Sequence, residues 1–170
     1  EATRACGLAC GHCRARAVRE RDPGELTGAE ADAMFRDLRA AGTRRLVVTG
    51  GDPLERPDLF DRLAAAREAG LAPALSPSVT PRLTADALRR AAAAGVSAVS
   101  LSLDGADPAT HDAFRGVPGA FAATVRAAAD VRAAGCVLRV NTTVTRTSLP
   151  ELPALAELAA AWGAETWAVF

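Results

Sequence analysis

The stretch TADALRRAAAAGVSAVSLSLD, residues 84–104, predicts a helix, a closing glycine and a strand. The alanine-rich run from about Thr84 to Ala94 is typical of a helix, and Gly95 suits its C-terminal cap. The run that follows, up to Asp104, alternates apolar and polar residues, as a strand with two unlike faces does. If this unit recurs along the chain, it predicts an α/β fold.

The unit recurs along the whole chain. Glycines close five helical runs, at Gly42, Gly70, Gly95, Gly135 and Gly163. Strands are expected after them, at residues 45–50, 71–79, 96–104, 137–144 and 165–170. Two of the helices are predicted to begin with a capping box, Thr27 with Glu30 and Ser148 with Glu151. Short connections between alternating strands and helices predict parallel strands with right-handed crossovers.

The two faces of the expected strands distinguish a barrel from an open sheet. In the strand that ends at Asp104, Ser100 and Ser102 share its face, whereas Val99 and Leu101 lie on the other. A buried strand of an open doubly wound sheet would be apolar on both faces. We therefore expect an α/β fold, a partial (βα)6 TIM-like barrel of parallel strands with outer helices and a polar lumen, truncated in its first and sixth strands.

One connection is longer than the others. The interval between Gly95 and Gly135 exceeds the other intervals between closing glycines, which predicts an insertion at Gly105 to Gly119. This segment follows the carboxyl end of a strand, where barrel enzymes carry their active sites. It is expected to form a lid or a substrate-contacting loop, or else a surface loop without a task.

Composition excludes several classes of protein. The chain has 170 residues, 49% of them hydrophobic, and a formal net charge of zero, so a phosphate-tracking nucleic-acid surface is not expected. All of its 20 basic residues are arginine, which excludes a Schiff-base lysine and the usual P-loop. No apolar run is long enough to cross a membrane, and four cysteines without a secretory signal fit a reducing compartment. We therefore expect neither nucleic acid nor membrane as a partner and place the protein in the cytoplasm.

The chemistry-bearing stretch is CGLACGHC, in which Cys6, Cys10 and Cys13 follow C-x3-C-x2-C spacing. Three thiolates on one loop can hold three corners of an iron–sulfur cube and leave the fourth iron open. A zinc site is the competing interpretation, and it would need His12 or the distant Cys136 as a fourth ligand. The spacing favours the three-cysteine cluster and leaves zinc open.

These residues resemble the cluster loop of radical S-adenosylmethionine (radical SAM) enzymes. Two further stretches resemble the same family in the expected order, Thr49-Gly50-Gly51-Asp52-Pro53 and Ser102-Leu103-Asp104-Gly105 with the following His111-Asp112-Ala113-Phe114-Arg115-Gly116. The second stretch resembles the branch that carries a C-terminal SPASM/Twitch-type auxiliary cluster domain, which includes peptide maturases and enzymes of alternative heme synthesis. Residues 1–170 would then be an incomplete radical SAM core domain without that auxiliary domain, because the chain looks cut at both ends.

The resemblance implies the cofactors and the reaction. A [4Fe-4S] cluster on Cys6, Cys10 and Cys13 would bind S-adenosylmethionine, whose reductive cleavage yields a 5′-deoxyadenosyl radical. That radical would remove a hydrogen atom from a peptide or tetrapyrrole substrate. The resemblance also implies a low-potential electron donor, flavodoxin or ferredoxin. For the donor, an arginine run beside the cluster is a candidate docking surface: Arg14, Arg16, Arg19 and Arg21.

Cofactor-binding residues are expected at the strand ends, and no catalytic residue is assigned. They are Gly50, Gly51, Asp52, Pro53, Ser102, Asp104, Arg139, Asn141 and His12. Backbone carbonyls of the Gly-Gly turn would receive the methionine amino group, although the same residues also suit a plain tight turn. Ser102, Asp104, Arg139 and Asn141 would bind the carboxylate or ribose of the cofactor, with an Arg139–Asp104 salt bridge as an equal alternative.

Three remaining residues carry weaker expectations. His12 is expected to stack near the adenine or to shield the cluster. His111 reads as a surface histidine that could touch substrate, and Cys136 as a small buried residue. The alternative function for the whole chain is a non-catalytic binding module, a barrel stabilised by zinc or by a structural cluster.

Overall fold

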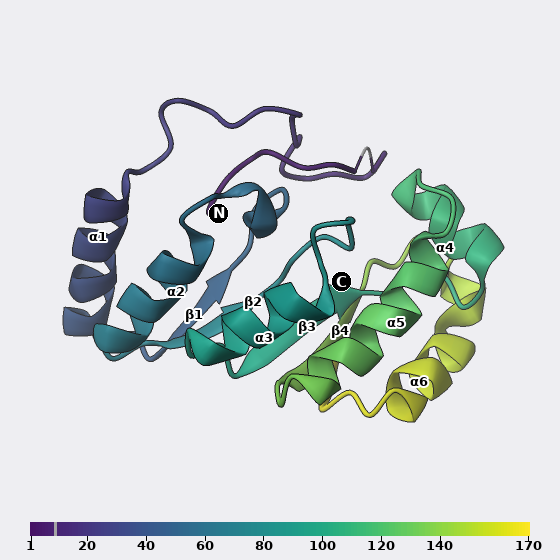
Figure 1. Cartoon of the computed structure of the whole chain (residues 1–170). Coiled ribbons are helices and arrows are strands. Elements are labelled where there is room, and N and C mark those ends of the chain that lie inside the picture. Colours follow the sequence, from purple (N-terminus) through teal and green to yellow (C-terminus); the bar gives the residue numbers. More distant parts are fainter. Residues whose placement is uncertain (9) are drawn as a thin grey trace.

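A computed structural model gives the structure of residues 1–8 and 10–170 (Figure 1). The described residues form one parallel sheet of five strands in the order β1-β2-β3-β4-β5. The strands are β1 (Arg45–Val48), β2 (Ala72–Leu75), β3 (Ala98–Ser102), β4 (Val137–Thr142) and β5 (Thr166–Val169). The α-helices are α1 (Gly28–Ala40), α2 (Leu59–Glu68), α3 (Ala85–Ala93), α4 (Pro108–Arg115), α5 (Ala120–Ala133) and α6 (Leu152–Ala161). The predicted parallel α/β architecture is confirmed.

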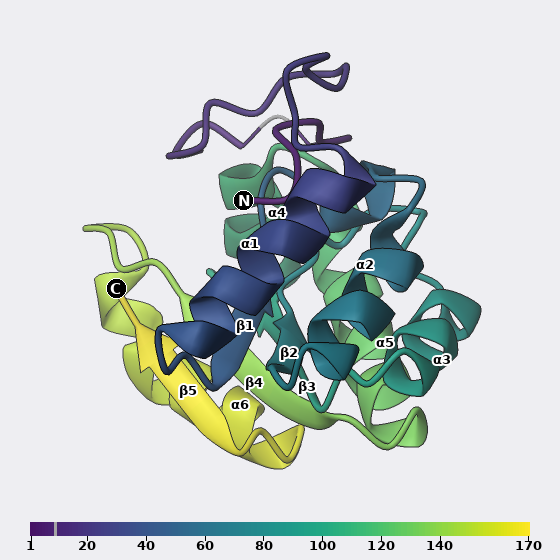
Figure 2. The ribbon, with the colours of Figure 1, turned by 90° about the vertical axis from the view of Figure 1, so that its left-hand side faces the viewer.

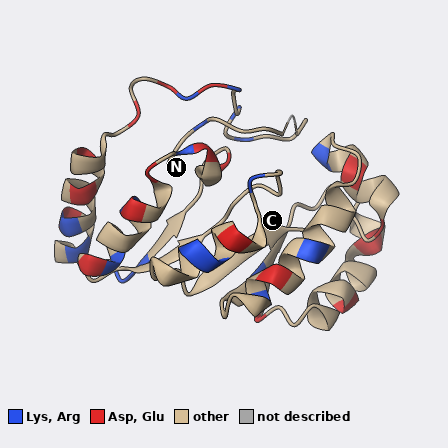
Figure 3. Cartoon of the chain, viewed as in Figure 1, with Lys and Arg blue, Asp and Glu red and all other residues tan. Residues whose placement is uncertain are grey.

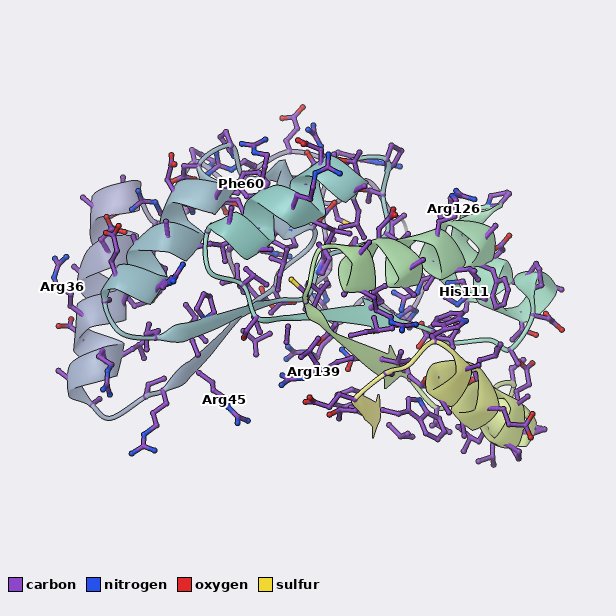
Figure 4. The ribbon with its side chains drawn as sticks, turned by 60° about the horizontal axis from the view of Figure 1, so that its bottom comes forward. Arg36, Arg45, Phe60, His111, Arg126 and Arg139 are labelled. Atoms are coloured by element: carbon purple, nitrogen blue, oxygen red, sulfur yellow. The ribbon has the colours of Figure 1, made fainter. Side chains whose placement is uncertain are left out.

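The core lies between the helices and one face of the sheet (Figure 2). Leu75, Val99, Leu101 and Leu138 on this face are buried against α2, α3 and α5. The opposite face is the one expected to be polar, and Arg45 and Arg139 project from it, away from the helices (Figure 4). Parallel pairing places Ser100 beside Arg139 and Ser102 beside Asn141 on that face. We call it the open face.

The N-terminal segment takes the place expected for the first, partial strand. It is not one of the five strands, but its backbone pairs with the residues that follow β1. The amide of Gly51 donates to the carbonyl of Thr3 at 2.8 Å, and that of Asp52 donates to Ala5 at 2.7 Å. This pairing brings the cysteine loop to the carboxyl end of the sheet.

The insertion after β3 contains a helix that the sequence interpretation did not predict. Asp107 is its N-cap and accepts from the amide of Thr110, Pro108 occupies the first turn, and Gly116 ends the helix in the left-handed conformation. These are ordinary start and stop signals. The expectation of a loop at Gly105 to Gly119 was therefore wrong for α4, although the segment does lie at the carboxyl ends of the strands.

One predicted capping box forms and the other does not. Thr27 and Glu30 cap α1 reciprocally. Before α6, the short 3-10 turn η2 (Leu149–Glu151) has no side-chain cap. Glu151 instead accepts from the amide of Ala106 at 2.6 Å and from the Thr110 hydroxyl at 2.7 Å, so it ties α4 to the start of α6. No helix among the described residues has the length and apolar character needed to cross a membrane.

Candidate cluster and cofactor site

A loop that is closed at its base carries the three cysteines, and we call it the cysteine loop. Its base is the bridge between Ala5 and Val18, where the amide of Cys6 donates to Val18 at 2.9 Å and that of Val18 donates to Arg4 at 3.0 Å. The Arg4 guanidinium also donates to the carbonyls of Ala15 and Arg16. Cys6, Cys10 and Cys13 therefore lie on a loop whose two ends are held together at Ala5 and Val18.

The cysteine loop lines one side of a cavity of about 700 Å³ at the carboxyl ends of the strands. All three cysteines line it. So do four of the expected cofactor-binding residues, Gly50, Gly51, Ser102 and His12. Ser76, Ser78, Arg115 and Thr143 complete the wall that faces the sheet. The three cysteines, the Gly50-Gly51 turn and Ser102, which are remote in sequence, thus surround one space large enough for a small-molecule ligand.

The sulfur atoms receive hydrogen bonds from the loop itself. The amide of Leu8 donates to Cys6 Sγ at 3.4 Å, and the amide of Ala17 donates to Cys13 Sγ at 3.4 Å. Such donors stabilise the thiolate form that metals require. No three histidine, cysteine, aspartate or glutamate side chains in residues 1–8 and 10–170 are close enough to share a single ion. An iron–sulfur cube gives each cysteine its own iron atom, and the three thiols that line this cavity are the ligand set that such a cube requires.

The residues of the Gly-Gly turn have two structural roles: Gly51 allows another backbone segment to approach, and Asp52 stabilises the turn. A Cβ on Gly51 would lie 2.3 Å from the Ala5 carbonyl oxygen, so only glycine permits the N-terminal segment to approach. Asp52, in contrast, is fully buried and accepts from the Thr80 hydroxyl at 2.7 Å and the Leu54 amide at 3.1 Å. Burial raises the pKa of the Asp52 carboxyl, an effect that these hydrogen bonds oppose. Its side chain supports the turn, while Pro53 begins the 3-10 turn η1 (Pro53–Glu55).

Asp104 forms an ion pair with Arg115 and is fully buried. Its other carboxylate oxygen accepts from the amide of Thr143 at 2.7 Å. The alternative Arg139–Asp104 salt bridge was therefore wrong. Arg139 instead lies 3.9 Å from Glu165, and its Nε atom is buried without a hydrogen-bond partner.

Arg139 and Asn141 lie lower on the open face than the cavity-lining residues. Asn141 is in register with Ser102, which lines the cavity, and Arg139 is in register with Ser100, one step deeper. Both side chains are half-buried. Neither is among the residues that line the cavity, so the structure does not bring these two expected residues to it.

His12 stacks on Phe114 of α4, with ring centroids 3.9 Å apart and an interplanar angle of 28°. Partial burial lowers the pKa of His12, and the nearby Arg115 charge lowers it further. Burial raises the pKa of the Cys10 thiol, whereas the charge of Arg115 and its side-chain hydrogen bond oppose that rise. The last two residues of α4 therefore contact the cysteine loop.

Sequence reasoning missed three participants. Arg115 and Ser78 line the cavity, and the Ser78 hydroxyl lies 3.4 Å from Cys6 Sγ while donating to the Gly51 carbonyl at 2.9 Å. His111 is 1% exposed, so its interpretation as a surface residue was wrong. Arg115 and His111 both lie in the stretch quoted above, and the polar alternation after β2 marked Ser78. Cys136 is buried as expected.

Comparison with known proteins completes the description. Residues 1–159 match the family described as the Radical SAM superfamily. The AdoMet-dependent heme synthase of Nitratidesulfovibrio vulgaris is 42% identical over 170 residues, which are 100% of this chain and 46% of that protein. The mycofactocin maturase MftC of Mycobacterium tuberculosis is 33% identical over 165 residues, 96% of this chain and 41% of that protein.

A solved structure shares the fold. The crystal structure of Streptococcus suis SuiB bound to the precursor peptide SuiA superposes with a TM-score of 0.80 at 19% identity, over 99% of this chain and 37% of that one. The chain thus spans less than half the length of each of these three proteins. The motif order, the cysteine-roofed cavity and the match over residues 1–159 show that the chain belongs to the radical SAM superfamily of enzymes.

Proposed function

We propose that residues 1–170 form the core domain of an enzyme that generates a 5′-deoxyadenosyl radical from S-adenosylmethionine and uses it to remove a hydrogen atom from a tetrapyrrole. One observation carries the proposal: Cys6, Cys10 and Cys13 line the same cavity as Gly50 and Ser102. Radical SAM enzymes use a [4Fe-4S] cluster and S-adenosylmethionine, which together supply the radical when bound. The chain itself must bind these groups, orient them and exclude water.

Each expected residue has a task in this proposal. Cys6, Cys10 and Cys13 hold the cluster, and the carbonyls of Gly50 and Gly51 receive the methionine amino group. Ser102 lies across the cavity and hydrogen-bonds the cofactor. Asp52 and Asp104 act indirectly, because their carboxylates already bind Thr80 and Arg115. Pro53 fixes the turn that presents the glycines.

Arg139 and Asn141 are proposed to meet a carboxylate on the open face. Arginine binds carboxylates in a fork geometry, and the Arg139 guanidinium has one long contact with Glu165 and an unpartnered buried Nε. The carboxylate of S-adenosylmethionine and that of a substrate are both suitable partners. His12, stacked on Phe114, lies at the cavity wall where an adenine ring would add to the stack.

The substrate class rests on the relatives. The heme synthase is 42% identical over the whole chain, against 35% over 167 residues for the PqqA peptide cyclase of Ruegeria pomeroyi, which favours a tetrapyrrole over a peptide. A porphyrin with several carboxylate side chains would complement Arg139 and Arg45 on the open face (Figure 4). A peptide remains the second candidate, because a peptide cyclase belongs to the same set of relatives.

A low-potential flavodoxin or ferredoxin is proposed as the electron donor. Arg14 and Arg16 are exposed beside the cluster loop and can meet an acidic protein. Arg19 and Arg21 contribute less, since Arg19 donates to the Gly7 carbonyl and Arg21 pairs with Glu25. Basic and acidic positions are otherwise mixed over the helices (Figure 3). The four free cysteines suit the reducing cytoplasm, which we propose as the location.

The test uses the full-length protein that contains this chain. After anaerobic reconstitution with iron and sulfide, it should show an electron paramagnetic resonance signal on reduction, and S-adenosylmethionine should change that signal. Iron coproporphyrin III should then raise the yield of 5′-deoxyadenosine and be consumed, whereas a precursor peptide should do neither. A colourless protein with one tightly bound zinc ion would contradict the proposal and support a binding module. Consumption of the peptide alone would contradict only the substrate class.

A further inference from the structure

Helix α4 ends against the cluster loop at two neighbouring positions. Phe114 stacks on His12 at 3.9 Å, and Arg115 lines the cavity together with Cys10. Cys10 and His12 belong to one turn, in which the amide of Cys13 donates to the Cys10 carbonyl at 3.1 Å. The end of α4 therefore lies against this turn, and none of the expected cofactor tasks requires such a contact.

The side chain of Arg115 is fixed by an ion pair with a buried carboxylate. Asp104 pairs with its guanidinium and is fully buried, and the amide of Thr143 donates to the second carboxylate oxygen at 2.7 Å. The amide of Asp104 in turn donates to Nδ1 of the buried His111 at 3.1 Å. An arginine fixed in this way has already lost its rotamer freedom, so a further hydrogen bond costs little entropy. Asp104, its ion-pair partner, does not line the cavity, whereas Arg115 does.

We propose, on the basis of the function proposed above, that Arg115 is a positioning residue for the iron–sulfur cluster: anchored by Asp104, it directs its guanidinium at the sulfur of Cys10 and raises the reduction potential of the cluster. Hydrogen bonds to cluster sulfurs and nearby net charge are established determinants of such potentials. A cation beside the cluster stabilises the reduced form, which carries one more negative charge. Phe114 assists by keeping the loop against α4.

The location of Arg115 argues against two simpler roles. A surface ion pair would be screened by water, but the side chains of Arg115 and Asp104 are only 15% and 0% exposed. A purely structural pair would not need to line the cavity, as Arg115 does. An interaction with the carboxylate of S-adenosylmethionine is a distinct role, and the experiment separates it because the potential is measured with and without that cofactor.

The test is a redox titration of the full-length reconstituted protein, monitored by electron paramagnetic resonance with and without S-adenosylmethionine. The variants are Arg115→Gln and Arg115→Lys, each checked for iron and sulfide content. Arg89→Gln is the control, because Arg89 is an arginine of α3 whose side chain is 65% exposed and which does not line the cavity. At the poise where half of the wild-type cluster is reduced, Arg115→Gln should lower the ratio of reduced to oxidised cluster about tenfold, equivalent to about 59 mV for one electron.

Arg115→Lys keeps the positive charge but loses the planar guanidinium, so its shift should be smaller than that of Arg115→Gln, and Arg89→Gln should show none. If Arg115→Gln cannot retain the cluster, Arg115→Lys must still shift the potential downward. A wild-type potential in cluster-loaded Arg115 variants would overturn this inference while leaving the proposed function intact. A shift seen only after adding S-adenosylmethionine would also overturn it, and would assign Arg115 to the cofactor. A wild-type protein that binds no cluster would defeat the proposed function itself.

Discussion

The imidazole of His12 and the phenyl ring of Phe114 stack with their centroids 3.9 Å apart, which joins the cysteine loop to α4. One residue lies directly before Cys13, and the other lies in the insertion that follows β3. The stack is the aromatic part of the contact between α4 and the cysteine loop, so we expect it to restrain the loop from moving away from the cavity.

Replacing Phe114 by Leu should therefore loosen the loop without emptying the space. Aromatic pairs contribute about 1 kcal/mol beyond their buried area, so release of the loop should become about fivefold more favourable. The measurement is the rate at which a chelator removes iron from the reconstituted protein. Phe60→Leu is the control, because Phe60 stacks with Arg90 on the helical side of the sheet. Equal rates in both variants would show that the stack does not restrain the loop.

Gly51→Ala should disrupt the pairing between the N-terminal segment and the end of β1. The new Cβ would lie 2.3 Å from the Ala5 carbonyl oxygen and 2.7 Å from that of Arg4, and both are backbone atoms. Overpacking of this kind costs about 1–3 kcal/mol, so the denaturant midpoint should fall. The iron and sulfide content should fall as well, because the N-terminal segment leads directly into the cysteine loop and positions it.

Gly28→Ala is the matched control for that substitution. Its Cβ would meet only the side-chain end of Arg62, at 3.3 Å, and Gly28 is the first residue of α1. Alanine is the better helix former, so stability should be unchanged or higher. If Gly51→Ala behaved like Gly28→Ala, the close approach of the two backbones would not matter for stability.

Asp52→Asn should leave stability within about 1 kcal/mol of wild type. Burial raises the pKa of the Asp52 carboxyl, so its ionised form is disfavoured in the folded protein. Wild-type stability should therefore fall relative to the variant as the pH rises from the unfolded carboxyl pKa of about 3.9 through the raised folded value. The asparagine amide can still accept from Leu54 and can donate to the Thr80 hydroxyl. Calorimetric titration should give nearly unchanged affinity for S-adenosylmethionine.

Asp52→Ala separates the support of the turn from a cofactor contact. It removes both hydrogen bonds and leaves the buried Thr80 hydroxyl without an acceptor for its proton, which should cost about 1–3 kcal/mol in denaturant unfolding. A large loss of cofactor affinity in Asp52→Asn, at unchanged stability, would instead assign the carboxylate to the cofactor.

The sequence was sufficient for the features that depend on local order. The alternation of Ser100 and Ser102 with Leu101 and the glycines that close the helices predicted the strand directions, the parallel sheet and the polar face. Cysteine spacing placed three residues that the structure brings to one cavity.

Partner choice was not predictable, because it depends on distances between elements. The sequence analysis considered only Arg139 as a partner for Asp104, but the path of α4 brings Arg115 to it instead. Glu151 has the spacing of a capping residue after Ser148, but α4 offers it the Ala106 amide and the Thr110 hydroxyl instead. His111 looked exposed because its helix was not predicted.

His111 should make stability depend on pH in a defined window. Burial, followed by the charge of Arg115, lowers the pKa of His111 to about 4. Its Nδ1 accepts from the Asp104 amide, so the proton of the neutral ring lies on Nε2, which is 3.5 Å from the Thr124 hydroxyl. An unfolded histidine titrates near 6.5, so the unfolded chain binds the extra proton first as the pH falls. The stability supplied by His111 is therefore complete above about pH 6.5 and is lost progressively toward pH 4.

His111→Asn keeps an acceptor near the Asp104 amide and cannot titrate. The difference in unfolding free energy between wild type and this variant should be constant above about pH 6.5 and then change by up to 1.4 kcal/mol per pH unit below it, a slope reduced by any remaining solvent access. Denaturant unfolding at a series of pH values measures that difference, in which the acid sensitivity of the other groups cancels. Parallel stability curves down to pH 4 would mean that His111 takes up its proton in the folded protein as easily as in the unfolded chain. In that case the hydrogen bond from the Asp104 amide to His111 would not be needed to hold Asp104 in its ion pair with Arg115.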